Sequence, residues 1–271
     1  MASGRLPTYF LSHGGGPWPY LTGRFRKAFA KLEASITALP KDLGVTPKAI
    51  LVVSGHWEEK DFAVTASPKP PMVYDYSGFP AHTYQIKYDA PGSPELAEKI
   101  AAILNGVGLR SHTDQGRGFD HGTFVPLAVA YPKADIPVVQ LSIRTDYDPL
   151  AHFQVGRALA PLRDQGVLII GSGLSFHNLQ MIGPEAAYPS REFDNWLGET
   201  MKAQPEERKN RLLKWVEAPF ARISHPQEDH FVPLFVAVGA AEGERSYRIY
   251  HEDNFMGGIM VSSFRLGENL A

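Results

Sequence analysis

The chain has 271 residues, of which 44% are hydrophobic, 21% charged and 11% aromatic, and its formal net charge is −2. This is the composition of an ordinary globular protein, and a near-neutral charge without a basic stripe argues against nucleic acid or a membrane surface as a partner. Because cysteine is absent, disulfides, iron–sulfur clusters and thiol nucleophiles are excluded, and any metal must be held by nitrogen and oxygen.

Length and hydropathy predict one domain over residues 1–271, since α/β domains of this size are common. The N-terminal segment lacks the apolar stretch of a secretory signal. The longest nearly apolar segment, residues 231–241, is far shorter than the roughly 20 residues that cross a bilayer. We therefore expect a cytoplasmic protein, and a homodimer is an assembly that the sequence allows.

Three short apolar runs are predicted to be buried strands that end in small residues close to a histidine. Residues 8–11 lead to His13, residues 50–53 lead to His56, and residues 167–170 lead through Gly-Ser-Gly to His177. In open α/β sheets, ligands bind beyond the carboxyl ends of the strands. The three imidazoles are therefore predicted to converge on one rim, which suggests a metal site.

The remaining segments predict a central, mostly parallel or mixed β-sheet flanked by helices. The first helix is expected from the spacing of apolar residues after Phe25 and is expected to close at Pro40. Ser93 and Pro94 predict the start of another helix, as cap and first helical residue. The other expected elements are strands at 62–67, 84–88, 136–143, 247–250 and 259–264, a loop over a pocket at 74–80, a helix at 150–166, and charged helices at 190–219 divided by Pro205.

Two further histidines stand at the entries of short apolar helices. Asp120-His121 and Asp229-His230 each precede an apolar segment with a proline expected in the first turn of the helix. The exposed N–H groups of a helix start favour anions and bound oxygen ligands. Both histidines are therefore candidates for the same site.

A single histidine is more often structural than functional, so the combination carries the argument. His13, His56, His121, His177 and His230 each lie beside glycine, serine or acidic residues at the end of a strand or the start of a helix. The other five histidines lack this setting and are expected at the surface or behind the site: His82, His112, His152, His225 and His251. Nitrogen and oxygen ligands with open positions suit Zn(II) or non-haem Fe(II).

Other catalytic patterns fit less well. No His-Glu-x-x-His helix is present, which argues against the familiar zinc peptidases, and neither Ser54 nor Ser172 lies in a Gly-x-Ser-x-Gly elbow. The triple glycine at 14–16 lacks the Gly-Lys-Ser/Thr ending of a phosphate loop.

Several motifs, in order and nearly end to end, resemble the class III extradiol ring-cleavage dioxygenases, and within them the 4,5-DOPA dioxygenase branch. They are Leu-Ser-His-Gly-Gly-Gly-Pro at 11–17, Ser-Gly-His-Trp at 54–57, the segment 74–92, Asp-His-Gly at 120–122, Gly-Ser-Gly at 171–173 with His-Asn-Leu at 177–179, and His-Pro-Gln-Glu-Asp-His at 225–230.

The resemblance implies Fe(II) bound by His13, His56 and a third ligand that we match to His230, with Glu228 as the rival. A glutamate occupies that position in the related protocatechuate branch. His177 would be the acid/base histidine, and His121 a second pocket histidine that contacts substrate or oxygen. Three aromatic residues are expected to line the substrate pocket, although packing is an equal alternative for each: Trp57, Tyr74 and Phe79.

The function implied is a non-haem Fe(II)-dependent dioxygenase that inserts O₂ into a catechol-type ring, DOPA-like or related, to give a ring-opened semialdehyde. Zn(II) could replace iron in purified protein. Two alternatives stay open at this stage. Three histidines around Zn(II) could activate water for hydrolysis on the same fold, and the superfamily also contains non-enzymatic members with altered site residues.

Overall fold

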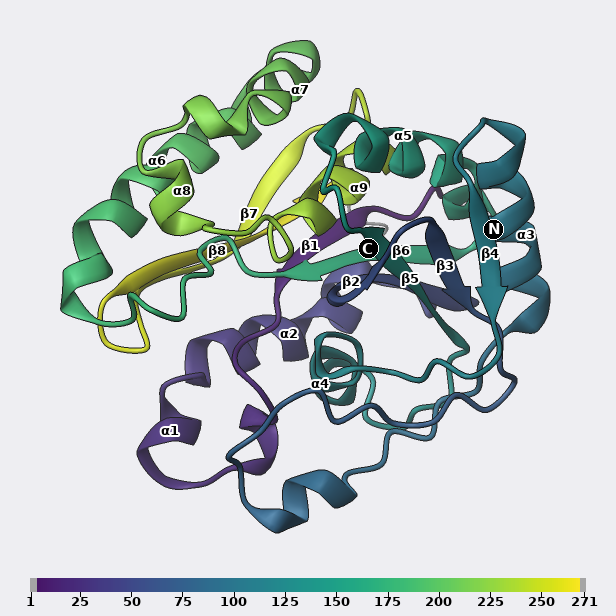
Figure 1. Cartoon of the computed structure of the whole chain (residues 1–271), viewed down its shortest axis with the longest axis horizontal. Coiled ribbons are helices and arrows are strands. Elements are labelled where there is room, and N and C mark those ends of the chain that lie inside the picture. The colour runs from purple at the N-terminus through teal and green to yellow at the C-terminus, as the bar shows by residue number, and fades with distance from the viewer. Residues whose placement is uncertain (1–3, 269–271) are drawn as a thin grey trace.

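The computed structural model describes residues 4–268, which build one eight-stranded mixed sheet with helices on both faces (Figure 1). The strand order is β4-β3-β5-β2-β6-β1-β8-β7. This architecture confirms the predicted fold class. The strands are β1 (Thr8–Ser12), β2 (Ala49–Glu59), β3 (Phe62–Thr65), β4 (Ser111–Asp114), β5 (Val138–Arg144), β6 (Val167–Gly173), β7 (Ser246–Phe255) and β8 (Ile259–Leu266).

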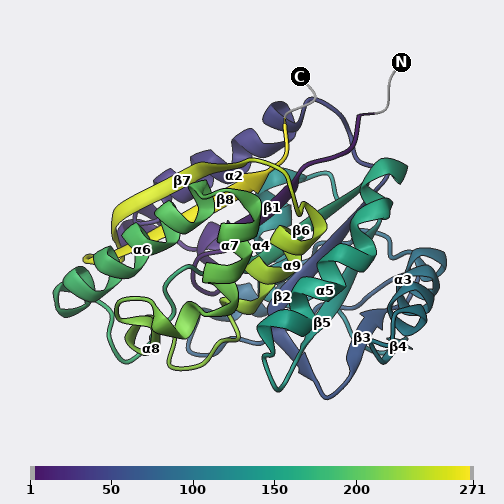
Figure 2. The same ribbon diagram turned by 90° about the horizontal axis from the view of Figure 1, so that it is seen from above.

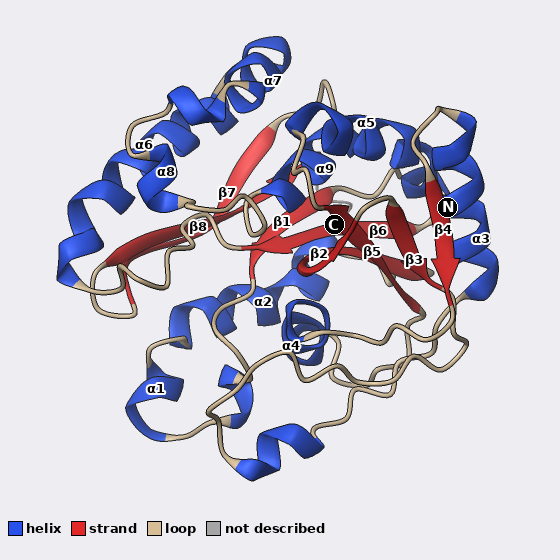
Figure 3. Cartoon of the chain, in the orientation of Figure 1, coloured by secondary structure: helices blue, strands red, loops and turns tan. Residues whose placement is uncertain are grey.

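The four central strands run parallel, so their carboxyl ends share one edge of the sheet (Figure 3). β1 pairs with β6, β6 with β2, and β2 with β5, all in parallel register. The flanks are antiparallel where β8 pairs with β1, where β7 pairs with β8, and where β3 meets β5. The histidines after β1 and β6 therefore start from the same edge.

Two helical layers bury the sheet, because alternate residues of a strand point to opposite faces. Leu51 and Val53 of β2 pack in the same core as α3, α5, α6, α7 and α9, which spread over one face in Figure 2. Ile50 and Val52 pack in the other core with α2 and α4. The helices are α1 (Gly23–Lys27), α2 (Ala30–Leu43), α3 (Pro94–Gly106), α4 (His121–Ala130), α5 (Pro149–Leu159), α6 (Ala187–Lys202), α7 (Pro205–Leu213), α8 (Ala221–Ser224) and α9 (Val232–Ala240).

Several helix predictions hold. Ser93 Oγ accepts a hydrogen bond from the Leu96 N–H at 3.3 Å, as expected of a helix cap. Pro205 begins α7 and so divides the charged helices. The helix expected over 150–166 stops as an α-helix at Leu159 and continues to Gln165 as a 3₁₀ helix, with Pro161 in its first turn.

Other boundaries were predicted wrongly. Pro40 lies inside α2, which ends instead at Gly44, where the left-handed backbone (φ 76°) favours glycine. Pro126 lies inside α4 and not in its first turn, whereas Pro233 does occupy the first turn of α9. β2 also does not stop before its histidine. It continues through Glu59, with its ladder to β5 interrupted between Val53 and Glu58.

The strand expected at 84–88 does not exist. Residues 81–85 form a 3₁₀ helix, and the segment after it is extended but pairs with no strand in the described chain. The apolar residues alternate in this segment because Ile86 and Tyr88 are both buried in the core beside α2 and α4. Among the described residues, no helix combines the length and apolar character that a bilayer crossing requires.

Candidate active site

The loops that carry the histidines are fastened to one another by backbone hydrogen bonds. The N–H of His13 donates to the Gly173 carbonyl at 3.0 Å, and the N–H of Leu174 donates to the His230 carbonyl at 3.0 Å. Glycine is needed at 173, because a Cβ there would lie 2.0 Å from the His230 carbonyl oxygen. The close approach of these backbones brings histidines from both ends of the chain together.

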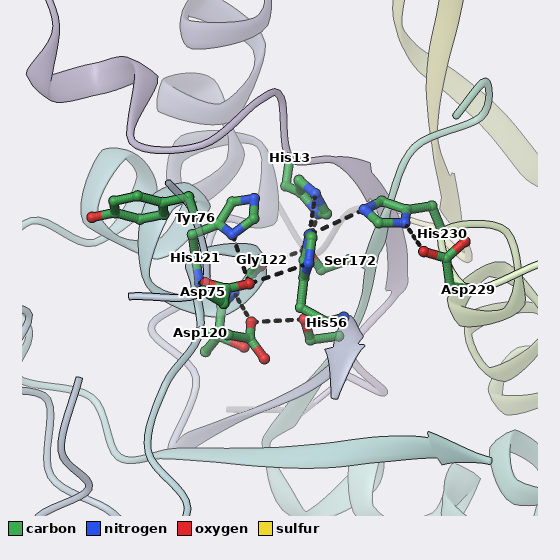
Figure 4. A network of polar contacts seen from close by, with 12 residues as sticks. His13, His56, Asp75, Tyr76, Asp120, His121, Gly122, Ser172, Asp229 and His230 are labelled. Atoms are coloured by element: carbon green, nitrogen blue, oxygen red, sulfur yellow. Dashed lines mark hydrogen bonds and ion pairs between the residues drawn. The ribbon is translucent and has the colours of Figure 1, made fainter. Parts of the chain in front are cut away.

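Three imidazoles point their Nε2 atoms at one another, as Figure 4 shows. His56 Nε2 lies 3.2 Å from His13 Nε2 and 3.0 Å from His230 Nε2. His121 also belongs to this group, because one of its ring nitrogens lies within 4.8 Å of those of His13 and His56. The structure therefore brings together two overlapping sets of three histidines that share His13 and His56.

Each of the three converging imidazoles has its other ring nitrogen close to an oxygen, and in His13 and His230 this contact is a hydrogen bond. His230 Nδ1 lies 2.6 Å from Asp229 Oδ2, and His56 Nδ1 lies 3.2 Å from Asp75 Oδ2. His13 Nδ1 lies 3.0 Å from Ser172 Oγ. The Ser172 hydroxyl donates to the Gly122 carbonyl, so its oxygen accepts from His13.

The partners of His13 and His230 fix the tautomers of these two rings, because a carboxylate, or a hydroxyl whose proton is already donated, can only accept from Nδ1–H. In the neutral rings of His13 and His230 the Nε2 atoms then carry lone pairs and no proton. Both lone pairs point at His56 Nε2, 3.2 and 3.0 Å away, and a cation bound among the three nitrogens would stabilise this arrangement. Three anchored imidazoles with converging free nitrogens are a donor set that suits Zn(II) or Fe(II).

The electrostatics keep these rings neutral. Burial, reinforced by the neighbouring imidazoles, holds the pKa of His13 and of His56 well below the usual value. Burial and His177 lower the pKa of His230 to about 4, against the opposing effect of Asp229. Burial alone would raise the pKa of Asp229, but its contacts with His177 and His230 hold that pKa below its usual value. Neutral imidazoles beside ionised carboxylates are ready to bind a metal near neutral pH.

His121 and His177 lie beside this group in different settings. His121 is the first residue of α4, where both its backbone N–H and its Nδ1 bond to Asp75, at 3.0 and 2.9 Å. His177 stacks on His230 with ring centroids 3.4 Å apart, and its Nδ1 lies 3.8 Å from Asp229 Oδ1. His121 is thus fixed by Asp75 at two points, whereas His177 is held mainly by stacking.

A cavity of about 250 Å³ opens over the histidines. All five histidines of the predicted set line it. The other lining residues are Gly14, Gly15, Gly16, Asp75, Tyr76, Leu174, Phe176, Asn178, Leu179, Ile182, Phe255, Met256 and Ile259. The three consecutive glycines at 14–16 therefore form part of the cavity wall.

Three predicted substrate contacts lie outside this lining. Trp57 is buried, with its indole N–H on Glu59 and the Arg117 guanidinium over its ring. Tyr74 and Phe79 pack on the lining residue Tyr76, with ring centroids 6.2 and 5.5 Å away. All three side chains therefore have the packing role that was the alternative prediction. Their direct contact with a substrate stays a prediction.

The other polar residues considered in the sequence analysis lie outside the cavity lining. Glu228 pairs with Arg222 at 2.7 Å and is not among the residues that line the cavity. Ser54 donates to Asp120 at 2.7 Å and is fully buried. His152 and His225 are fully buried, so of the two positions expected for them, at the surface or behind the site, the surface is excluded. Each donates from its ring to a backbone carbonyl, of Asp148 and Ser175 respectively.

Sequence reasoning missed Asp75 and Asp229 as anchors of the imidazoles. Asp229 carried a signal, since it directly precedes His230. Asp75 carried none, because it comes from a loop more than forty residues from His121 in sequence.

Comparisons with known proteins agree with this geometry. The family described as "Catalytic LigB subunit of aromatic ring-opening dioxygenase" matches residues 7–264. A 4,5-DOPA dioxygenase extradiol from Beta vulgaris is 42% identical over 257 residues, 93% of each chain. One from Escherichia coli K12 is 34% identical and covers 98% of this chain and 97% of its own. The crystal structure of an uncharacterized protein from Escherichia coli K12 superposes with a TM-score of 0.79 at 30% identity, covering 97% of this chain and all of the other.

The chain therefore belongs to the family of the catalytic LigB subunit of aromatic ring-opening dioxygenases, within the class III extradiol enzymes. It is an extradiol ring-cleavage dioxygenase, as the sequence motifs predicted.

Proposed function

We propose that the enzyme uses Fe(II), held by His13, His56 and His230, to open the ring of a catechol with O₂ and give a ring-opened semialdehyde. The observation that carries this proposal is the convergence of three Nε2 atoms, with that of His56 lying 3.2 Å from that of His13 and 3.0 Å from that of His230. When bound, Fe(II) would supply the one-electron chemistry that allows a catechol to react with O₂.

His230 is preferred over His121 as the third ligand. Its Nε2 lies 3.0 Å from His56 Nε2, a separation that suits two nitrogens bound to one metal ion. Within the described residues, the His121 ring makes its hydrogen bond through Nδ1, to Asp75, and none through Nε2. Glu228 is unsuited, because its carboxylate is engaged by Arg222.

The chain's own residues would manage the protons. His121 Nε2 can contact a catechol oxygen and, once protonated, donate to the oxygen on which negative charge develops. His177 lines the same cavity, and its side chain is 21% exposed, so it can exchange protons with solvent and act as the acid/base group. Asp75 would hold His121 in place through both of its oxygens.

Ring opening balances without a further reductant. One ring carbon–carbon bond beside a hydroxyl breaks, both atoms of O₂ enter the product, and the protons of the two hydroxyls are retained or released to solvent. The apolar part of the cavity lining excludes water from the reacting ring.

The test is to load the protein with Fe(II) without oxygen and then add a catechol and ¹⁸O₂. We expect a yellow product that carries both labelled atoms, and no such product from protein loaded with Zn(II). A panel of catechols that causes no oxygen uptake would overturn the proposal. Activity that follows Zn(II) and needs no O₂ would favour hydrolysis instead.

A further inference from the structure

One carboxylate lies fully buried beside the histidines, outside the cavity lining. Asp120, labelled in Figure 4, accepts hydrogen bonds at both of its oxygens. The donors are the Ser54 hydroxyl at 2.7 Å, the Thr123 N–H at 3.2 Å, the Arg117 guanidinium at 3.2 Å and the Gln140 amide. A buried charge is costly unless it is paired and hydrogen-bonded. This carboxylate meets both conditions.

The backbone of His56 is held by two of these donors. Ser54 Oγ accepts from the His56 N–H at 3.2 Å, while its own hydroxyl donates to Asp120. Arg117 Nη2 donates to the His56 carbonyl at 3.1 Å and to Asp120 at 3.2 Å. Asp120 is therefore connected to the backbone N–H and to the carbonyl of His56, through one side chain in each case.

The sheet does not fix His56. Pairing of β2 with β6 ends at Ser54, and pairing with β5 is interrupted between Val53 and Glu58. His56 therefore has no partner residue in either neighbouring strand. Its backbone is held instead by the side chains of Ser54 and Arg117, so the place of its imidazole depends on where these two side chains lie.

The same carboxylate fixes the start of α4, whose first residue is His121. Asp120 directly precedes the helix and accepts from an N–H of its first turn, as a helix cap does. This turn packs tightly on the strand that carries His56. A Cβ at Gly122 would lie 2.6 Å from Ser54 Oγ and 3.0 Å from His56 Cδ2. Asp120 thus connects the position of His56 with that of His121.

A helix cap and a buried ion pair also stabilise folds that have no site nearby. Asp194 provides the comparison, because it is 2% exposed, accepts from the Ser262 hydroxyl at 2.6 Å and pairs with Arg248 at 3.2 Å. None of these three residues lines the cavity. Asp120 differs from Asp194 in that its side-chain partners reach the backbone of a cavity histidine.

We propose that Asp120 is a positioning residue, which holds the backbone of His56 through two side chains in a fixed place relative to His121. This inference rests on the proposed function, in which His56 binds the metal and His121 contacts the substrate. The role differs from that of Asp75, which lies against the two imidazole rings themselves.

The experiment compares Asp120→Asn with Asp194→Asn. Asparagine keeps the shape of the side chain, but its amide N–H₂ cannot accept, so two of the four donors around Asp120 lose their acceptor. Fe(II) affinity is measured by anaerobic titration against a competing chelator, and the stability of the metal-free protein by urea unfolding. We expect both variants to lose stability. Only Asp120→Asn should lose Fe(II) affinity, by roughly 10- to 100-fold, the range known for residues that orient metal ligands.

A second pair of variants removes one connection and leaves the carboxylate in place. Ser54→Ala deletes the oxygen that accepts from the His56 N–H, and the smaller side chain fits the fully buried position. We expect a loss of Fe(II) affinity of roughly two- to tenfold, the size of one hydrogen bond. Ser262→Ala removes the corresponding hydroxyl beside Asp194 and should bind Fe(II) as the wild type does. This pair decides the question if Asp120→Asn does not fold.

The outcomes separate this inference from the proposed function. An Asp120→Asn protein that binds Fe(II) as tightly as Asp194→Asn overturns the positioning role, and so does a Ser54→Ala protein that matches Ser262→Ala. In both cases the proposed function stands. The proposed function itself fails if the wild-type protein binds no Fe(II), or takes up no oxygen with any catechol.

Discussion

Replacing Asp75 with asparagine is expected to weaken both metal binding and turnover. Asp75 accepts from His121 Nδ1 at 2.9 Å and lies 3.2 Å from His56 Nδ1, through the same oxygen. Its other oxygen accepts from the His121 N–H at 3.0 Å. Asparagine keeps the size but removes the charge, and its amide N–H₂ cannot accept.

The magnitude follows from the two imidazole contacts. The His121 hydrogen bond to the carboxylate and the close His56 contact, at about 1 kcal/mol each, amount to about 2 kcal/mol. At about 1.4 kcal/mol per factor of ten, the expected loss is roughly 30-fold, within the 10- to 100-fold range known for residues that orient metal ligands.

The assay separates the two histidines that Asp75 contacts. Anaerobic titration of Fe(II) against a competing chelator reports the loss through His56. The kcat at saturating Fe(II) reports the loss through His121. Asp61→Asn is the matched control, because Asp61 pairs with Arg110 at 3.1 Å on an exposed surface. An Asp75→Asn enzyme that matches this control in both measurements would refute the reasoning.

Three other changes have defined outcomes. His177→Ala should lower kcat by at least roughly 100-fold while Fe(II) affinity measured by titration is retained, since general acid/base groups contribute that much; a loss of metal instead would contradict the assignment. Glu228→Gln should leave the Fe(II) content unchanged by metal analysis. Burial lowers the pKa of His152 from 6.5 to about 4, so the unfolded chain takes up this proton first and stability is lost as pH falls from 6.5 towards 4. His152→Gln should remove about 3 kcal/mol of that pH dependence, measured by urea unfolding, whereas a variant with the wild-type dependence would exclude this origin.

The convergence of the histidines was predictable because it follows from topology. Parallel strands present their carboxyl ends at one edge, so the histidine after β1 and the one that follows β6 had to start near one another. His230 was assigned by resemblance, and its loop reaches the site through the Leu174 N–H bond to its carbonyl.

The supporting residues could not be predicted in the same way. Asp75 reaches two histidines from an irregular loop, and no periodicity encodes where such a loop folds. Alternating apolar residues at 86 and 88 looked like a strand, yet they pack into a core without strand pairing. Pro40 looked like a helix end, but Gly44, four residues later, supplies the left-handed turn that ends α2.

The anaerobic Fe(II) binding isotherms of His230→Ala and His121→Ala test the central claim most directly, because the structure gathers two histidine sets that differ only in this residue. We expect His230→Ala to lose at least roughly 100-fold in Fe(II) affinity, and His121→Ala to bind Fe(II) with little change but turn over slowly. Tight Fe(II) binding by His230→Ala, with loss of metal in His121→Ala, would contradict the account.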